Sequence, residues 1–133
     1  MDEKLKTQIE GLGGDDARII RGDFERELYS RDIGEVPFAK RLFDTTPELV
    51  IQPRSIETLK KIVQFANDEK VALFPRGSVS SGLGGVVPTV KGVVLDLSFM
   101  KTLSLKKKAL PKKYKREGDY TLYTTLKVQT GVR

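Results

Sequence analysis

A strand–helix–strand pattern in the middle of the chain is the feature that most limits its fold. Residues 49–52 form a short apolar run that ends at Pro53, which predicts a buried strand. An amphipathic pattern begins after Ser55, a good N-cap residue, and stops near Lys70, which predicts a helix with one apolar face. Residues 71–74 are apolar again and predict a second buried strand. Such a βαβ unit implies two strands that pair in parallel through a right-handed crossover.

The remaining patterns predict a small mixed sheet around this βαβ unit, and therefore an α+β fold class. A short amphipathic helix is expected over residues 5–12, where two glycines follow it, and a helical turn over 24–28. Residues 93–97 predict a third strand and residues 122–128 a fourth. We expect these last two strands to form an antiparallel hairpin at the edge of the sheet.

The residue types that are absent exclude several kinds of chemistry. The chain contains no Cys and no His, so disulfides, thiolate metal sites and Ser-His-Asp or Cys-His catalysis cannot be built from it. No stretch approaches the ~20 apolar residues that a membrane helix needs, and the mixed charges of the first ten residues do not match a secretory signal. We therefore expect a cytoplasmic protein with no membrane span, and assign no catalytic residue and no metal site within the chain.

The positive charge is concentrated in one segment. Residues 106–116 hold seven Lys and Arg and no acidic residue, which leaves −1 for the rest of a chain whose net charge is +6. A nucleic-acid-binding domain usually spreads its positive charge over a face or a helix, so binding to nucleic acid is not favoured. We expect this basic segment to be a solvated connection between two strands. A phosphate-binding tail and a docking surface for an acidic partner are the alternatives.

A loop rich in glycine and serine follows the second strand and is the strongest candidate for a binding site. Four glycines and three serines lie among residues 77–85. Such a backbone can approach an anion closely and converge its amides on it, and ligands of α/β sheets tend to lie at the carboxyl ends of strands. The loop therefore suits a diphosphate, although its spacing is neither the G-x-G-x-x-G fingerprint nor a Walker loop. A flexible loop without a ligand is the alternative.

Several motifs, in matching order and spacing, resemble a known flavin-binding family. They are the run 49–55, the sequence Phe74-Pro75-Arg76-Gly77, the run 94–100, and upstream Tyr29-Ser30-Arg31-Asp32. Together they resemble the amino-terminal part of the PCMH-type FAD-binding domain of the vanillyl-alcohol oxidase/p-cresol methylhydroxylase superfamily. The most similar branch holds glycolate oxidase FAD subunits and D-lactate dehydrogenases. The resemblance implies that residues 46–133 are the truncated first lobe of this domain, after a helical and loop segment at residues 1–45.

The resemblance also implies which residues hold the cofactor. The family's loop binds the FAD pyrophosphate through main-chain amides and a hydroxyl group, and Ser80 stands in the hydroxyl position. Ser78 and Val79 replace the usual glycines, and a positive φ at Val79 would be strained. Without His or Cys, FAD would be bound non-covalently. The predicted cofactor-binding residues are Arg76, Gly77, Ser78, Val79, Ser80, Ser81, Gly82, Gly84 and Gly85.

Four polar residues near these motifs are expected to have structural roles. Arg76 is expected to brace the loop through a carboxylate, and direct contact with a phosphate is the alternative. Asp96 ends a strand and is expected to accept hydrogen bonds in a turn or cap, while Tyr29 and Asp32 are expected to pack or hydrogen-bond near the start of the domain.

In function, the resemblance implies the amino-terminal part of an FAD-dependent dehydrogenase or oxidase for a 2-hydroxy acid such as glycolate or D-lactate. The partners implied are the second FAD lobe, a substrate domain, an electron-acceptor subunit, and a second copy docked through the face that the missing lobe would cover. We expect the chain alone to hold FAD weakly and to be inactive. A non-enzymatic module that binds phosphate or nucleic acid, and an assembly module, are the alternatives.

Overall fold

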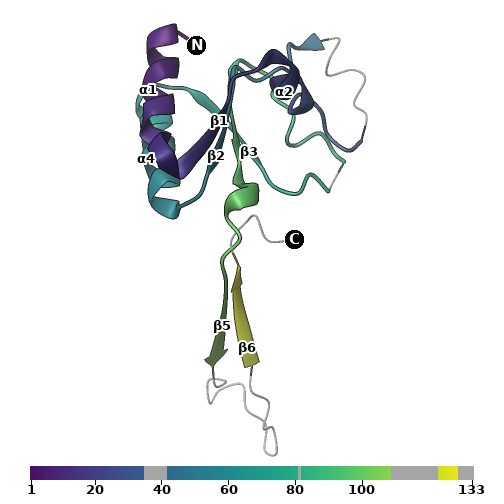
Figure 1. The fold of residues 1–133 in the computed structure, drawn as a ribbon. Helices are drawn as coiled ribbons and strands as arrows, with labels where there is room; N and C mark the ends of the chain where they lie inside the picture. Colours follow the sequence, from purple (N-terminus) through teal and green to yellow (C-terminus); the bar gives the residue numbers. More distant parts are fainter. Residues whose placement is uncertain (35–41, 81, 109–122, 129–133) are drawn as a thin grey trace, which may run out of the picture.

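A computed structural model of the chain describes residues 1–34, 42–80, 82–108 and 123–128, with the backbone alone for 104–108 and 123–128. Helices, 3-10 turns and strands follow one another in the order shown in Figure 1. They are α1 (Glu3–Gly13), η1 (Gly14–Asp16), β1 (Ala17–Ile20), α2 (Asp23–Leu28), β2 (Leu49–Pro53), α4 (Ile56–Asp68), β3 (Ala72–Arg76), β4 (Gly92–Asp96), η2 (Leu97–Phe99), β5 (Leu103–Lys108) and β6 (Tyr123–Val128).

The main sheet is mixed, which confirms the predicted α+β class. Its strand order is β1-β2-β4-β3, with β2, β4 and β3 parallel and β1 antiparallel to β2. The two strands of the βαβ unit are therefore parallel, but the expectation that they pair directly is wrong, because β4 lies between them. All five residues of β4 are buried, whereas those of β3 are partly exposed. The fully buried strand β4 thus takes the central place, and β3 lies at the edge.

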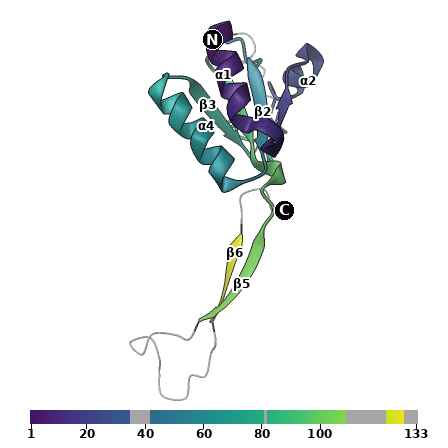
Figure 2. The same ribbon diagram turned by 60° about the vertical axis from the view of Figure 1, so that its left-hand side comes forward.

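Two helices cover one face of this sheet. Figures 1 and 2 show α1 and α4 side by side on that face, while α2 lies on the other side. Because side chains alternate along a strand, one set faces the helices and the other set faces α2. The first set forms the core with the helices and comprises Ile9, Leu49, Ile51, Ile62, Val93 and Leu95. The second set comprises Ile20, Val50 and Val94, with Tyr29 and Phe74 packed against it.

Helix α4 begins and ends where its sequence predicts. The Ser55 hydroxyl accepts a hydrogen bond from the Thr58 amide at 3.2 Å and caps the amino terminus. At the carboxyl end the Val71 amide donates to the Ala66 carbonyl at 2.8 Å, as in a Schellman motif, which requires a left-handed residue. That residue is Lys70, with φ of 58°.

The predicted hairpin between residues 93–97 and 122–128 is wrong. Both sides of β4 are already occupied by β2 and β3, so β6 pairs instead with β5, from Leu103↔Val128 to Lys108↔Tyr123. This second sheet extends away from the main body (Figure 1). The first three lysines of the basic segment lie in β5 and not in a connection between strands. The rest of that segment lies outside the described residues.

The segment before residue 46 is part of the same structure as the sheet. Residues 17–20 form the unexpected strand β1, and Ile9 of α1 is fully buried in the core. The division of the chain after residue 45 stays a prediction. No helix among the described ranges is long and apolar enough to cross a membrane.

Candidate cofactor-binding site

The three parallel strands end at one edge of the sheet, and each places a polar side chain there. Gln52 lies near the end of β2, Arg76 ends β3 and Asp96 ends β4. The glycine- and serine-rich loop leaves β3 at this edge before the chain returns as β4. Carboxyl edges of parallel strands are where α/β proteins bind their ligands.

The first part of the loop presents a run of unused hydrogen-bond donors. The amides of residues 77–80 donate no hydrogen bond to another described residue. The hydroxyl groups of Ser78 and Ser80 are hydrogen-bonded to each other at 3.2 Å, so one of the two O–H groups is left as a further donor beside these amides. Amides that lack a protein partner are the groups that an anion would satisfy.

The loop backbone turns through left-handed conformations. Gly82 and Gly84 have φ of 64° and 77°, which glycine adopts without strain. Val79 has φ of 56°, so the anticipated strain at this position is present in the structure. A Cβ on Gly85 would meet nothing within 4 Å, so this residue borders open space. Ser81 lies outside the described residues.

Arg76 braces the loop, but through main-chain carbonyls and not through the expected carboxylate. Its Nη1 donates to the carbonyl oxygens of Tyr29 at 3.3 Å and Arg31 at 2.9 Å. Its guanidinium carbon lies 5.1 Å from the centre of the Tyr29 ring. The neighbouring carboxylates are engaged elsewhere, Asp96 by side chains and a turn and Asp32 by two amides. Burial lowers the pKa of Arg76, while the charges of Tyr29, Asp96 and Asp32 act in the opposite direction.

A cluster of hydrogen-bonded polar side chains connects the carboxyl ends of β2 and β4 beneath the loop. The Tyr29 hydroxyl donates to Asp96 Oδ2 at 2.9 Å, and Gln52 Nε2 donates to the same oxygen at 2.6 Å. Asp96 Oδ1 accepts from the Ser98 amide at 2.9 Å and caps η2, which confirms the expected capping role. Burial raises the pKa of Asp96, but these hydrogen bonds outweigh burial and hold the pKa below its ordinary value.

Gln52 is the site residue that the sequence analysis missed. Its side chain is buried, and its Oε1 has no hydrogen-bond partner among the described residues. The available signal was one amide side chain in an otherwise apolar buried strand, which requires polar partners. The structure supplies such partners for Gln52 Nε2 but none, among the described residues, for Gln52 Oε1.

Asp32 joins the upstream segment to the far end of the loop. Its Oδ2 accepts from the Gly84 amide at 2.7 Å and its Oδ1 from the Ile33 amide at 2.6 Å. The expectation that Tyr29 and Asp32 hydrogen-bond within the chain is confirmed. The Gly84 amide is consequently occupied, unlike the amides at the start of the loop.

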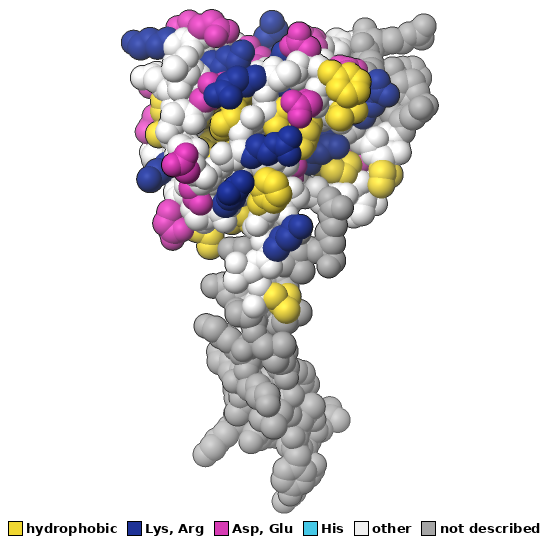
Figure 3. All heavy atoms as spheres, in the orientation of Figure 1, with side chains coloured by type: hydrophobic (Ala, Val, Ile, Leu, Met, Phe, Trp, Pro, Cys, Tyr) yellow, Lys and Arg dark blue, Asp and Glu magenta, His cyan; other side chains and the backbone are white. Residues whose placement is uncertain are grey.

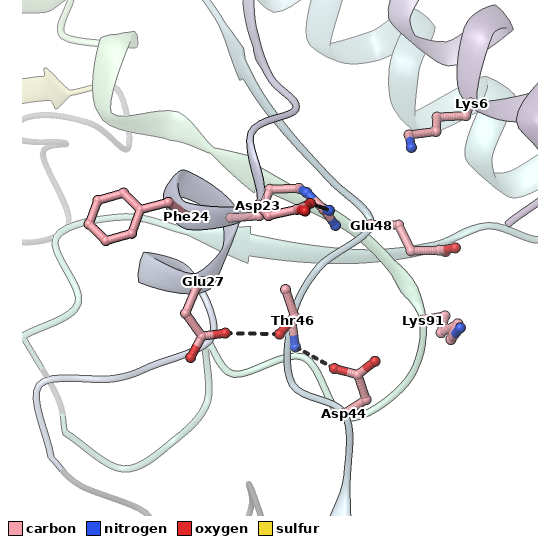
Figure 4. A pocket seen from close by; sticks show the side chains of 9 residues that line it. Lys6, Asp23, Phe24, Glu27, Asp44, Thr46, Glu48 and Lys91 are labelled. Atoms are coloured by element: carbon pink, nitrogen blue, oxygen red, sulfur yellow. Dashed lines mark hydrogen bonds and ion pairs between the residues drawn. The ribbon is translucent and has the colours of Figure 1, made fainter.

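A hollow of about 640 Å³ lies at the opposite edge of the sheet, near the amino ends of β2 and β4. Figure 4 shows acidic and basic side chains around it, among them Lys6, Lys91 and Glu48. Part of this lining is already satisfied, because Thr46 donates to Glu27 at 3.0 Å. The hollow contains none of the predicted cofactor-binding residues.

Fold and site together define an α+β domain in which a loop with unpartnered donors, as judged from the described residues, lies at the carboxyl edge of the parallel strands. The donors at the start of the loop are N–H and O–H groups, and they suit the diphosphate of a dinucleotide in charge and chemistry. The chain belongs to the FAD binding domain family, whose model matches residues 47–133. It shares the fold of the vanillyl-alcohol oxidase/p-cresol methylhydroxylase superfamily, and the cofactor of its family is FAD.

Curated relatives match part of the chain. It is 34% identical to D-lactate dehydrogenase of Archaeoglobus fulgidus, over 47% of this chain and 16% of the relative. It is 32% identical to the glycolate oxidase subunit GlcD of Bacillus subtilis, over 56% of this chain and 15% of the relative. The chain thus spans about one sixth of the length of these relatives.

Solved structures show the same fold at low sequence identity. Substrate-bound p-cresol methylhydroxylase superposes with a TM-score of 0.64 at 18% identity, covering 98% of this chain and 22% of that one. An alkyldihydroxyacetonephosphate synthase gives a TM-score of 0.63 at 18% identity, covering 77% of this chain and 22% of that one.

Proposed function

We propose that this chain is the amino-terminal part of an FAD-dependent oxidoreductase and that the loop of residues 77–85 holds the diphosphate of FAD. The observation that carries the proposal is the run of unpartnered amides at residues 77–80, placed at the carboxyl edge of the sheet in a family whose cofactor is FAD. An anion of two phosphates would satisfy these donors, which have no hydrogen-bond partner among the residues that the structure describes.

Each part of the loop has a distinct role in this proposal. The amides of residues 77–80 bind the diphosphate and the Ser80 hydroxyl adds a donor, whereas the role predicted for Ser81 falls on a residue outside the described ones. Gly82 and Gly84 turn the backbone, and Gly85 leaves space beside the cofactor. Arg76 holds the loop against the upstream segment instead of binding phosphate. Because the chain contains no His or Cys, neither residue type within it can tether the flavin covalently.

The proposed substrate is a 2-hydroxy acid of the glycolate or D-lactate type. Relatives named D-lactate dehydrogenase and glycolate oxidase subunit support this class. When bound, FAD supplies the electron acceptor for oxidation of the substrate. The chain's own residues bind and orient the cofactor, so the substrate site and an electron-acceptor partner are assigned to other parts of the protein.

Titration of the purified chain with FAD and with ADP tests the binding site. We expect Ser80→Asp to weaken both ligands by at least about tenfold, because a carboxylate beside the amides repels the diphosphate. Thr7→Asp is the matched control, since it adds the same charge on the exposed face of α1, and it should leave both affinities unchanged. A wild-type chain that binds neither ligand would contradict the proposal.

The proposed activity is tested on the full natural protein that carries this chain. Anaerobic mixing of the FAD-loaded protein with D-lactate or glycolate should bleach the absorbance of the oxidised flavin, whereas L-lactate serves as the stereochemical control. Full retention of the oxidised spectrum with every 2-hydroxy acid tested would contradict the substrate class and leave the FAD site standing.

A further inference from the structure

The segment from Tyr29 to Gly34 lies against the glycine-rich loop although almost fifty residues separate the two in sequence. This brace segment, residues 29–34, precedes the part of the chain that the FAD binding domain model matches, which begins at residue 47. Three independent sets of contacts fasten it to the loop or to the strand that leads into the loop.

The first contact fixes the far end of the loop through Asp32. One carboxylate accepts the amide of its neighbour Ile33 at 2.6 Å and the amide of Gly84 at 2.7 Å. Gly84 is also held by its carbonyl, which accepts from the Val87 amide at 3.1 Å. The residue at φ of 77° is therefore fixed through both its amide and its carbonyl.

The second contact is a close approach of two backbones. A Cβ built on Gly34 would lie 2.4 Å from the carbonyl oxygen of Gly82, so nothing larger than glycine fits without moving the loop. Gly82 itself has φ of 64°. The brace segment thus touches both left-handed glycines of the loop.

The third contact fixes the near end of the loop. Arg76, the last residue of β3, binds the carbonyl oxygens of Tyr29 and Arg31, and its guanidinium lies over the Tyr29 ring. The brace segment is therefore attached just before the unpartnered amides of residues 77–80 and again just after them.

We propose that Asp32 is a positioning residue for the cofactor diphosphate: it holds the loop in its binding shape through Gly84 without touching FAD. This inference rests on the proposed function, and it makes the FAD site dependent on residues upstream of the matched domain. Asp32 remains bound to Gly84 when the anion is present, since the diphosphate uses the unpartnered amides at the start of the loop.

A competing hypothesis predicts the opposite effect of removing the Asp32 charge on the affinity for the diphosphate. If the Asp32 carboxylate merely occupied an amide that the diphosphate needs, removing its charge would free Gly84 and tighten binding. The brace contacts at Gly34 and Arg76 favour the positioning role, because a carboxylate that leaves on ligand binding would not need two further attachments on either side of the loop.

The test compares Asp32→Asn with Asp15→Asn in titrations with FAD, ADP and adenosine. Asp15 is exposed and its side chain has no hydrogen bond or ion pair to another described residue, so its variant changes net charge equally without touching the loop. We expect Asp32→Asn to weaken FAD and ADP on the order of tenfold and to leave adenosine, which has no phosphate, unchanged. A merely structural role would not separate ADP from adenosine.

A measurement on the wild-type chain keeps the inference testable even if Asp32→Asn does not fold. In amide NMR spectra, addition of ADP should shift the signals of residues 77–80, while the Gly84 amide keeps its position and its protection from hydrogen exchange. A large shift or loss of protection at Gly84 on adding ADP would overturn the positioning role.

The remaining outcomes separate this inference from the proposed function. If wild type binds FAD and ADP and Asp32→Asn binds them equally or more tightly, the positioning role is overturned and the FAD site stands. If wild type binds neither, the proposed function fails and the inference fails with it.

Discussion

Val79 combines a branched side chain with a left-handed backbone, at φ of 56°. A β-branched residue in this region is strained by about 1–3 kcal/mol, and only a surrounding structure that fixes the loop can maintain it. The contacts of Asp32 and Arg76 on either side of the loop supply such constraints. The strain is located in the run of amides that we assign to the diphosphate.

Val79→Gly should therefore raise the free energy of unfolding by about 1 kcal/mol, because relief of strain exceeds the greater flexibility of glycine in the unfolded chain. Chemical denaturation measures the change. Lys70→Gly is the matched control, since Lys70 has nearly the same φ of 58° at the end of α4. Both variants should be more stable than wild type, and a Val79→Gly variant of equal or lower stability would show that the loop is not left-handed there.

Tyr29 should give the chain a specific sensitivity to alkaline pH. Burial, and then the hydrogen bond to Asp96, raise the pKa of Tyr29 from 10.0 to about 12. The native state thus holds the phenol proton more tightly than the unfolded chain does. This stabilisation is complete below pH 10 and is lost as the pH rises through about 12.

The measurement is the free energy of unfolding of wild type and Tyr29→Phe as a function of pH. We expect the advantage of wild type to fall by on the order of 1 kcal/mol across that range, a magnitude reduced by the partial exposure of the side chain. A difference that stays constant with pH would show that the phenol is not buried against Asp96.

Single residues also show the limit of prediction at the site. The loop could be found from its composition, because Gly and Ser clustered directly after a buried strand are typical of a backbone that binds an anion. The hydrogen-bond partners of Arg76 and Gln52 could not be predicted from the sequence. Each partner lies 23 to 47 residues away along the chain and is brought into contact only by the fold.

At the scale of elements, the pairing of β3 with β4 depends on a glycine. Gly92 lies opposite Ala72, and a Cβ added there would sit 2.4 Å from the Ala72 carbonyl oxygen. That oxygen belongs to the backbone of a strand, so it cannot move aside without disturbing the sheet.

Gly92→Ala is expected to lower the free energy of unfolding by about 2–3 kcal/mol, as overpacking does. Gly11→Ala in α1 is the control, because a Cβ there would meet nothing within 4 Å and alanine favours a helix. Thermal unfolding should therefore shift down for the first variant and up for the second. Equal behaviour of the two would contradict the close approach of β3 and β4.

The presence of each helix and strand was easier to predict than the order in which the strands pair. The patterns of α4, β2, β3 and β4 are strongly periodic or continuously apolar, and the structure confirms all four. The position of β4 between β2 and β3 was missed, because apolar composition does not state the order of strands. The strand β1 was missed as well, since four residues with one exposed arginine give too short a pattern.

At the scale of the whole molecule, the described part of the concentrated positive charge and the strand that leads into the proposed cofactor-binding loop lie in different sheets. Figure 3 shows acidic and basic side chains mixed over one face of the body, in agreement with the net charge of −1 outside residues 106–116. Lys106, Lys107 and Lys108 lie in β5, in the second sheet that extends away from the body (Figure 2).

Replacing these three lysines by glutamine should leave the affinity for FAD and ADP within about twofold of wild type at physiological ionic strength, where charges are screened over about 8 Å. Isothermal titration calorimetry measures it. A steep loss of affinity for either ligand would place the basic segment at the cofactor. Salt-dependent binding to RNA or DNA that disappears in the variant would support the alternative function as a nucleic-acid-binding module.

The order of strands leaves β3 outermost in the described part of the sheet, and this strand contains the exposed Pro75. A proline nitrogen has no hydrogen to donate to a neighbouring strand, so proline is tolerated in an edge strand where its nitrogen faces solvent. A foreign strand approaching from this flank would meet an interrupted ladder and gain little from docking. Pro75 thus disfavours aggregation through the edge of β3, the strand that leads into the proposed cofactor-binding loop.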